Sequence, residues 1–84
     1  MYEVGADDQS HAEIDALPEM ALPLFVEARI AIEVAPWNGD AINAAFPEAP
    51  VRTLVFGAQS QGLITYLILE DQRRVDILKV LWIG

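Results

Sequence analysis

The sequence contains no cysteine and only one histidine, His11. Without cysteine, neither a disulfide framework nor a thiolate metal site can form. Serine is nearly as scarce, and neither Ser10 nor Ser60 stands in a G-x-S-x-G motif. A single histidine and two such serines do not make a convincing catalytic triad. We therefore expect no metal, no cofactor and no serine-nucleophile chemistry.

Positive charge is also scarce, with 5 Lys and Arg residues against 13 Asp and Glu residues and a net charge of −8. Residues 1–50 contain ten acidic side chains and one basic side chain, Arg29, whereas residues 51–84 contain three acidic and four basic ones. A protein that binds nucleic acid usually presents a basic stripe to the phosphates. The charge therefore argues against strong nucleic-acid affinity.

Long apolar runs are absent, since none approaches the roughly 18 residues of a membrane span, and no secretory signal opens the chain. We expect a cytoplasmic protein without membrane contact. The 84 residues predict one domain, 1–84, with a thin core. Yet 54% of them are hydrophobic, above the usual level of about 45–50%. Part of this apolar surface is expected to meet a partner.

The first half of the chain reads as a short strand followed by two helices. Tyr2–Val4 predicts the strand, and residues 7–17 predict a first helix in which Ser10 and Glu13 match a capping box. Residues 19–34 predict a second helix, and a proline follows each helix. The second helix has two apolar stripes on nearly opposite sides, so we expect burial between the sheet and another surface, such as the first helix. One stripe comprises Leu22, Val26, Ile30 and Val34.

Three β-rich runs separated by short turns follow residue 50 and predict an antiparallel meander: Val51–Phe56, Leu63–Glu70 and Arg74–Ile83. The fold class is then α+β, with the helices on one face of the sheet. Both faces of these strands are apolar, whereas a sheet with one wet face should alternate cleanly. Strict alternation in the last strand places three large side chains on the uncovered face. We predict that a partner protein or a second copy binds there, at Leu78, Val80 and Trp82.

The cations of the second half form the only candidate catalytic set. Arg52, Arg73, Arg74 and Lys79, together with Tyr66, could contact phosphate and stabilise a developing charge. Alternatively, they are solvated at strand ends or paired with neighbouring acids. The sequence does not fix the strand register, so it leaves open which of these side chains share a face.

The order of strand, helical hairpin and three-stranded meander resembles the RelE/ParE toxin superfamily. The resemblance begins with the opening strand at residues 2–4, the helix break at 17–18 and the end of the second helix at 35–37. It continues with a strand–turn–strand that carries a family tyrosine, at residues 51–54 and 62–68, and with the last strand at 75–80. The loops 36–39 and 69–74 also look like small uncharacterised actinobacterial proteins of this type.

The resemblance implies the toxin of a type II toxin–antitoxin pair, which either cleaves mRNA on the ribosome or inhibits DNA gyrase. In the mRNA-cleaving branch, basic side chains on the concave sheet face activate the ribose 2′-hydroxyl. Arg52 and Lys79 match two such basic positions, Tyr66 matches the family tyrosine, and we add Arg73 to this candidate catalytic set. Leu63 stands near the place of an arginine that the family commonly has.

We therefore expect a RelE/ParE-like toxin-type module that acts by binding a protein partner, with an antitoxin-like segment across the sheet. The sequence leaves open whether the protein is also an enzyme. One alternative is a ribosome-dependent mRNA endoribonuclease with a reduced basic site. A second alternative is a non-toxic homodimeric interaction domain of the same fold.

Overall fold

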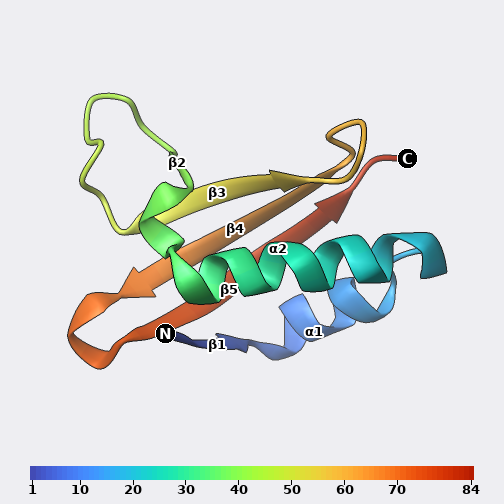
Figure 1. The fold of residues 1–84 in the computed structure, drawn as a ribbon, viewed down its shortest axis with the longest axis horizontal. Helices are drawn as coiled ribbons and strands as arrows, with labels where there is room; N and C mark the ends of the chain where they lie inside the picture. The colour runs from blue at the N-terminus through green and yellow to red at the C-terminus, as the bar shows by residue number, and fades with distance from the viewer.

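The computed structural model describes all 84 residues (Figure 1). Its strands are β1 Glu3–Ala6, β2 Asp40–Ala41, β3 Val51–Phe56, β4 Gly62–Leu69 and β5 Arg74–Trp82. Its helices are α1 Asp8–Asp15 and α2 Leu22–Val34, and its short 3-10 helices are η1 Glu19–Ala21, η2 Pro36–Asn38 and η3 Glu70–Gln72. The predicted α+β fold is confirmed, and β2 is an additional strand.

One five-stranded sheet, in the order β1-β5-β4-β3-β2, unites both ends of the chain. Strands β3, β4 and β5 form the predicted antiparallel meander. Strand β1 pairs in parallel with β5, with Glu3 opposite Arg74, so the start of the chain closes one edge of the sheet. Strand β2 extends the other edge by two residues, with Asp40 opposite Thr53. Two residues are too few to show a strand pattern in the sequence.

Asp7 is the N-cap of helix α1, and its carboxylate accepts a hydrogen bond from the Ser10 backbone N–H at 2.8 Å. The predicted capping box of Ser10 and Glu13 is wrong, because both side chains bind β5 instead. The buried Ser10 hydroxyl donates to the Ile77 carbonyl at 3.0 Å. The Glu13 carboxylate accepts a hydrogen bond from the Val80 N–H at 2.9 Å. These two bonds fix α1 to β5.

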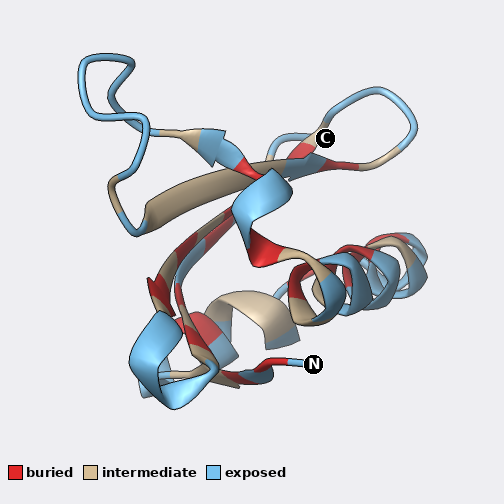
Figure 2. Cartoon of the chain, turned by 60° about the vertical axis from the view of Figure 1, so that its left-hand side comes forward, coloured by how far each residue is buried: buried red, intermediate tan, exposed pale blue.

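Helix α2 lies across the sheet and buries the side that bears Phe25, Ala28 and Ile32 (Figure 1). Its opposite side faces solvent, as the pale blue outer surface of the helix shows in Figure 2. The interpretation that the first helix covers this side is wrong, because α1 packs on β5 and β1 instead. Neither helix is long and apolar enough to span a membrane.

The core lies between the two helices and one face of the sheet. It takes alternate residues from the two central strands, as expected for strands with one covered face. The buried side chains of β4 and β5 are Ile64, Tyr66, Ile68, Val75, Ile77 and Val80. The other face of the sheet has no helix over it, and Figures 1 and 2 both show α1 and α2 on the same side.

A β-bulge in β5 breaks the strict alternation that the sequence predicted. Tyr66 lies opposite Ile77 and Thr65 lies opposite Lys79, so Leu78 is an extra residue without a partner on β4. Beyond the bulge the parity of the strand is reversed, and Val80 joins Ile77 on the face that the helices cover. The prediction that Leu78 and Val80 share the uncovered face is therefore wrong: Leu78 is 41% exposed and Val80 is 4% exposed.

Candidate functional site

The four side chains of the predicted catalytic set do not converge on one point of the structure. Arg52 and Tyr66 lie opposite each other on β3 and β4, on the face that the helices cover. Arg73 lies between η3 and β5, and Lys79 follows the bulge of β5. The catalytic role of this set stays a prediction, and the arrangement provides no common centre for it.

Tyr66 is a buried residue, with 1% of its surface exposed. Its hydroxyl donates a hydrogen bond to the Pro36 carbonyl at 2.6 Å and so fixes η2 over the sheet. Burial raises the pKa of Tyr66 above its ordinary value, which keeps the phenol neutral at physiological pH. A phenol enclosed in this way is placed to hold the fold together rather than to exchange a proton with a substrate.

The Arg52 guanidinium connects β3 to the loop that precedes it. Nη1 donates to the Gly39 carbonyl at 3.1 Å, and Nη2 donates to the Pro47 carbonyl. The guanidinium carbon lies 5.0 Å from the centroid of the Trp37 ring, in a cation–π contact. Its Nε–H is buried and has no hydrogen-bond partner. Arg52 therefore directs two of its five N–H donors to the backbone carbonyls of Gly39 and Pro47.

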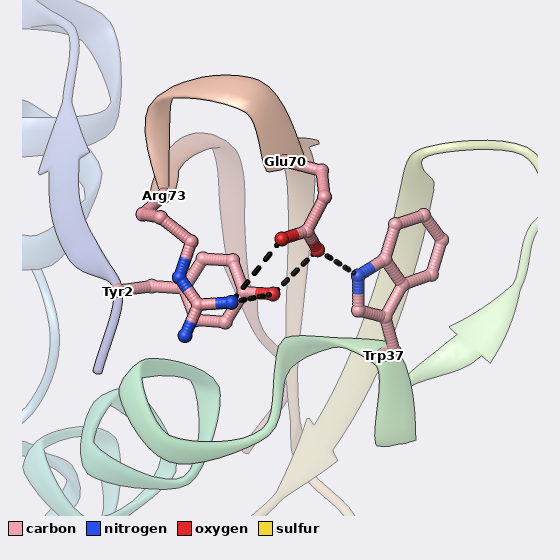
Figure 3. Close-up of polar contacts among 4 residues, drawn as sticks. All are labelled: Tyr2, Trp37, Glu70 and Arg73. Atoms are coloured by element: carbon pink, nitrogen blue, oxygen red, sulfur yellow. Dashed lines mark hydrogen bonds and ion pairs between the residues drawn. The ribbon is translucent and has the colours of Figure 1, made fainter.

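A polar cluster lies where η2, η3 and the first residues of the chain meet (Figure 3). Glu70 is at its centre, because Oε1 accepts hydrogen bonds from the Tyr2 hydroxyl at 2.5 Å and from Trp37 Nε1 at 2.7 Å. Arg73 Nη1 is 3.3 Å from both Glu70 Oε2 and the Tyr2 hydroxyl oxygen. The Arg73 guanidinium also lies 4.3 Å from the centroid of the Tyr2 ring. We call Tyr2, Trp37, Glu70 and Arg73 the Glu70 cluster.

Hydrogen bonds set the protonation state of the Glu70 cluster. The donors Tyr2, Trp37 and Arg73 lower the pKa of Glu70 below its ordinary value. The bond to Glu70 in turn raises the pKa of Tyr2. At neutral pH the cluster therefore holds an ionised carboxylate, a neutral phenol and a guanidinium. A carboxylate with a lowered pKa is a weak general base, so the cluster is better suited to holding its loops in place than to removing a proton.

Sequence reasoning missed the Glu70 cluster, apart from Arg73. Tyr2 and Glu70 are separated by 68 positions in the chain, and no periodic pattern relates residues so far apart. They meet because β1 pairs with β5 directly after the η3 turn, and because η2 places Trp37 beside that turn.

The remaining basic side chains are paired with acids. Lys79 Nζ lies 3.8 Å from Glu13 Oε2, and Arg74 Nε lies 2.7 Å from Asp76 Oδ1. These contacts match the alternative interpretation of the cations as paired surface residues. The acidic side chains are dispersed as well, because no group of three or more His, Cys, Asp or Glu residues could hold a metal ion.

The three predicted partner-binding residues have different surroundings. Leu78 is exposed on the bulge, whereas Val80 belongs to the core. Trp82 is half-buried and packs against the core, with its ring centroid 5.7 Å from that of Phe56. Of these three residues, only Leu78 therefore presents an exposed apolar side chain on the face without helices.

That face nevertheless carries a band of partly exposed aliphatic side chains. Val55, Leu63 and Leu81 lie side by side across β3, β4 and β5, and Val55 and Leu81 are 47% and 39% exposed. Contiguous apolar surface of this kind marks interaction sites. We call the aliphatic side chains of this face the open sheet face: Val51, Val55, Leu63, Leu67, Leu78 and Leu81. On the same face, the row Thr53, Thr65 and Lys79 lies between the row Val55, Leu63 and Leu81 and the pair Val51 and Leu67.

Comparison with known proteins gives matches in structure only, because no protein-family model and no curated protein matches the chain. The isolated E. coli RelE toxin superposes with a TM-score of 0.80 at 10% identity, over 100% of this chain and 86% of that chain. The intact E. coli RelBE toxin–antitoxin complex gives a TM-score of 0.80 at 10% identity, over 100% and 99%. The archaeal RelE–RelB complex from Pyrococcus horikoshii OT3 gives 0.64 at 19% identity, over 99% and 96%. The chain therefore has the fold of the RelE toxins over its whole length.

Proposed function

We propose that this protein is a RelE-like toxin-type module that acts by binding protein partners. The observation that carries the proposal is the fold match to a RelE toxin over the whole chain, at a TM-score of 0.80. Two of the similar structures are complexes, one described as toxin–antitoxin and one as RelE–RelB. This supports an antitoxin-like segment as one partner of the present chain.

The open sheet face is the surface that we assign to partner binding. Its six members are aliphatic and neither helix covers them, so a partner segment across them would remove aliphatic side chains from water. Leu78 belongs to this surface, whereas Val80 and Trp82 support it from the covered side. In this proposal the antitoxin-like segment and the cellular target compete for the same face.

The distribution of the cations favours binding over RNA cleavage. Cleavage needs several groups within reach of one ribose and its phosphate. Here Tyr66 is buried, Arg52 is bound to loop carbonyls, and Lys79 is paired with Glu13. Ribosome-dependent mRNA cleavage remains the enzymatic alternative, and it predicts that purified protein cuts ribosome-bound mRNA and loses this activity in an Arg73→Ala, Lys79→Ala variant.

Growth after inducible expression in a bacterial host tests the proposed function. We expect the native chain to arrest growth and a Val55→Glu, Leu81→Glu variant to lose this effect, because two carboxylates on the open sheet face oppose apolar contact. The Arg73→Ala, Lys79→Ala variant should still arrest growth. Gln59→Glu, in the exposed β3–β4 turn, is the matched control and should behave like the native chain.

Each variant must be soluble and folded by circular dichroism before its growth result counts. Normal growth with soluble native protein would reject the toxin assignment. Arrest that persists in the Val55→Glu, Leu81→Glu variant would reject the open sheet face. Arrest that is lost only in the Arg73→Ala, Lys79→Ala variant would favour RNA cleavage instead.

The second candidate function is a non-toxic homodimer closed through the same apolar face. It is favoured by the same band of exposed side chains, because a two-fold dimer can bury one patch against its own copy. Light scattering distinguishes the two candidates. A dimer that Leu81→Glu dissociates, together with normal growth, supports this second function, and a monomer that arrests growth contradicts it.

A further inference from the structure

Helix α2 carries a row of apolar side chains on the side that faces away from the sheet. Leu22, Val26, Ile30 and Val34 repeat every fourth residue and are 38%, 51%, 50% and 62% exposed. Figure 2 shows the outer side of this helix as exposed surface along its length. We call these four residues the α2 ridge. Rows with this spacing are the ridges by which one helix packs into the groove of another.

The α2 ridge lies in an acidic surrounding. Glu19 and Glu27 are exposed beside it, and neither has a cation within ion-pair distance. Arg29 is the only cation among residues 1–50, and it is 2.8 Å from Glu33 Oε1 and 3.2 Å from the Val4 carbonyl. The ridge is therefore an apolar row flanked by uncompensated negative charge.

We propose that the α2 ridge docks a basic amphipathic helix of a partner protein. The apolar side of that helix would cover the four aliphatic side chains, and its Lys or Arg residues would face Glu19 and Glu27. Such charge complementarity steers association and fixes orientation. The inference is independent of the proposed function, because the ridge lies on the opposite side of the molecule from the open sheet face.

Charge also distinguishes this occupant from others. A second copy would place two acidic helical halves against each other, each with nine more acidic than basic side chains, and like charges across an interface oppose association. Interfacial membrane helices carry Lys and Arg beside their apolar face, whereas this ridge is flanked by glutamates. A basic protein helix satisfies both the apolar row and the charges around it.

A pair of synthetic peptides tests the proposal on the full chain. The probe is an amphipathic helix of about five turns, or 18 residues, with leucines on one side and lysines on the other. The comparison peptide has glutamate in place of every lysine. We expect NMR shift changes at the α2 ridge on addition of the lysine peptide, and binding of the glutamate peptide weaker by at least about tenfold.

Substitutions then separate apolar contact from charge. The Val26→Gln, Ile30→Gln double variant should bind the lysine peptide at least about tenfold more weakly, a loss of roughly 1.4 kcal/mol of binding free energy. Glu27→Gln should weaken binding of the lysine peptide by a smaller factor, and Leu81→Glu on the open sheet face should leave this binding unchanged. Equal binding of both peptides, shift changes confined to the sheet, or a native dimer that Val26→Gln dissociates would each overturn the proposal. Loss of growth arrest in the sheet-face variant has no bearing on this result.

Discussion

At the scale of single residues, side chains that look catalytic by type hold loops in place. Tyr66 binds the Pro36 carbonyl, and Arg52 binds the carbonyls of Gly39 and Pro47. Both positions face the covered side of the sheet, where a polar side chain must find internal partners. In this structure the polar groups of both side chains are used for contacts within the chain.

Tyr66→Phe should destabilise the protein by about 1–3 kcal/mol, because the Pro36 carbonyl loses its buried donor. Urea unfolding measures the change in the free energy of unfolding. Tyr2→Phe is a matched control, because the Tyr2 hydroxyl donates its hydrogen bond to an exposed carboxylate, that of Glu70. If Tyr66 supports only structure, growth arrest per folded molecule should be unchanged. A stable Tyr66→Phe protein that no longer arrests growth would assign a functional role to this hydroxyl.

The Glu70 cluster predicts a pH dependence. Because the folded pKa of Glu70 is lowered, its contribution to stability is present above the unfolded pKa and is lost as the pH falls through the folded pKa. Tyr2→Phe removes a donor to the carboxylate, so the pKa of Glu70 should rise and stability should become less sensitive to acid. Carboxyl ¹³C NMR titration measures the pKa directly, and an unchanged Glu70 titration would contradict this account.

At the scale of elements, one extra residue decides which side chains of β5 lie on the face without helices. Leu78 is accommodated in the bulge as an extra residue. Lys79 therefore pairs with Thr65, and Val80 lies in the core. The same device explains why simple alternation assigned Val80 and Trp82 to the wrong face.

Deletion of Leu78 should therefore leave a folded protein. Ile77, Lys79 and Val80 would then alternate regularly, with Val80 still in the core. Deletion of Leu67 in β4 is the control, because no bulge absorbs it and either Tyr66 or Ile68 must leave the core. Thermal unfolding followed by circular dichroism should remain cooperative for the first variant and not for the second. The reverse order of stability would disprove the proposed role of the bulge.

Element order and fold class followed from the sequence because long periodic runs and prolines are local signals. The strand Val51–Phe56 was placed with its bounds as observed, whereas β2 is too short to carry a pattern. The site was harder to predict, since the Glu70 cluster depends on pairing between β1 and β5. The bulge at Leu78 and the exposure of the α2 ridge also depend on packing that no local pattern encodes.

At the scale of the whole molecule, the fold matches RelE toxins while the charge is strongly acidic. A net charge of −8 on 84 residues leaves the helical half with considerable self-repulsion. The basic sheet half, with a charge of +1, offsets little of it. The negative charge is therefore concentrated on the half of the chain that contains the helices.

Added salt should stabilise this protein by screening the repulsion. Between about 0.02 and 0.3 M NaCl the screening length falls well below the size of the helical half, so Tm should rise. A Glu19→Gln, Glu27→Gln variant should show a smaller rise, which separates screening from general salt effects. A Tm that falls with salt would show that the five ion pairs outweigh the repulsion.

The parallel pairing of β1 with β5 also determines when the protein can fold during its synthesis. Glu3 pairs with Arg74, and Ser10 bonds the carbonyl of Ile77, so the first strand and first helix have no docking site until β5 has been translated. A nascent chain that ends before Arg74 lacks both the edge of its sheet and the anchor of α1. Folding of this domain on the ribosome should therefore await the translation of β5, and an activity that needs the complete sheet cannot precede that point.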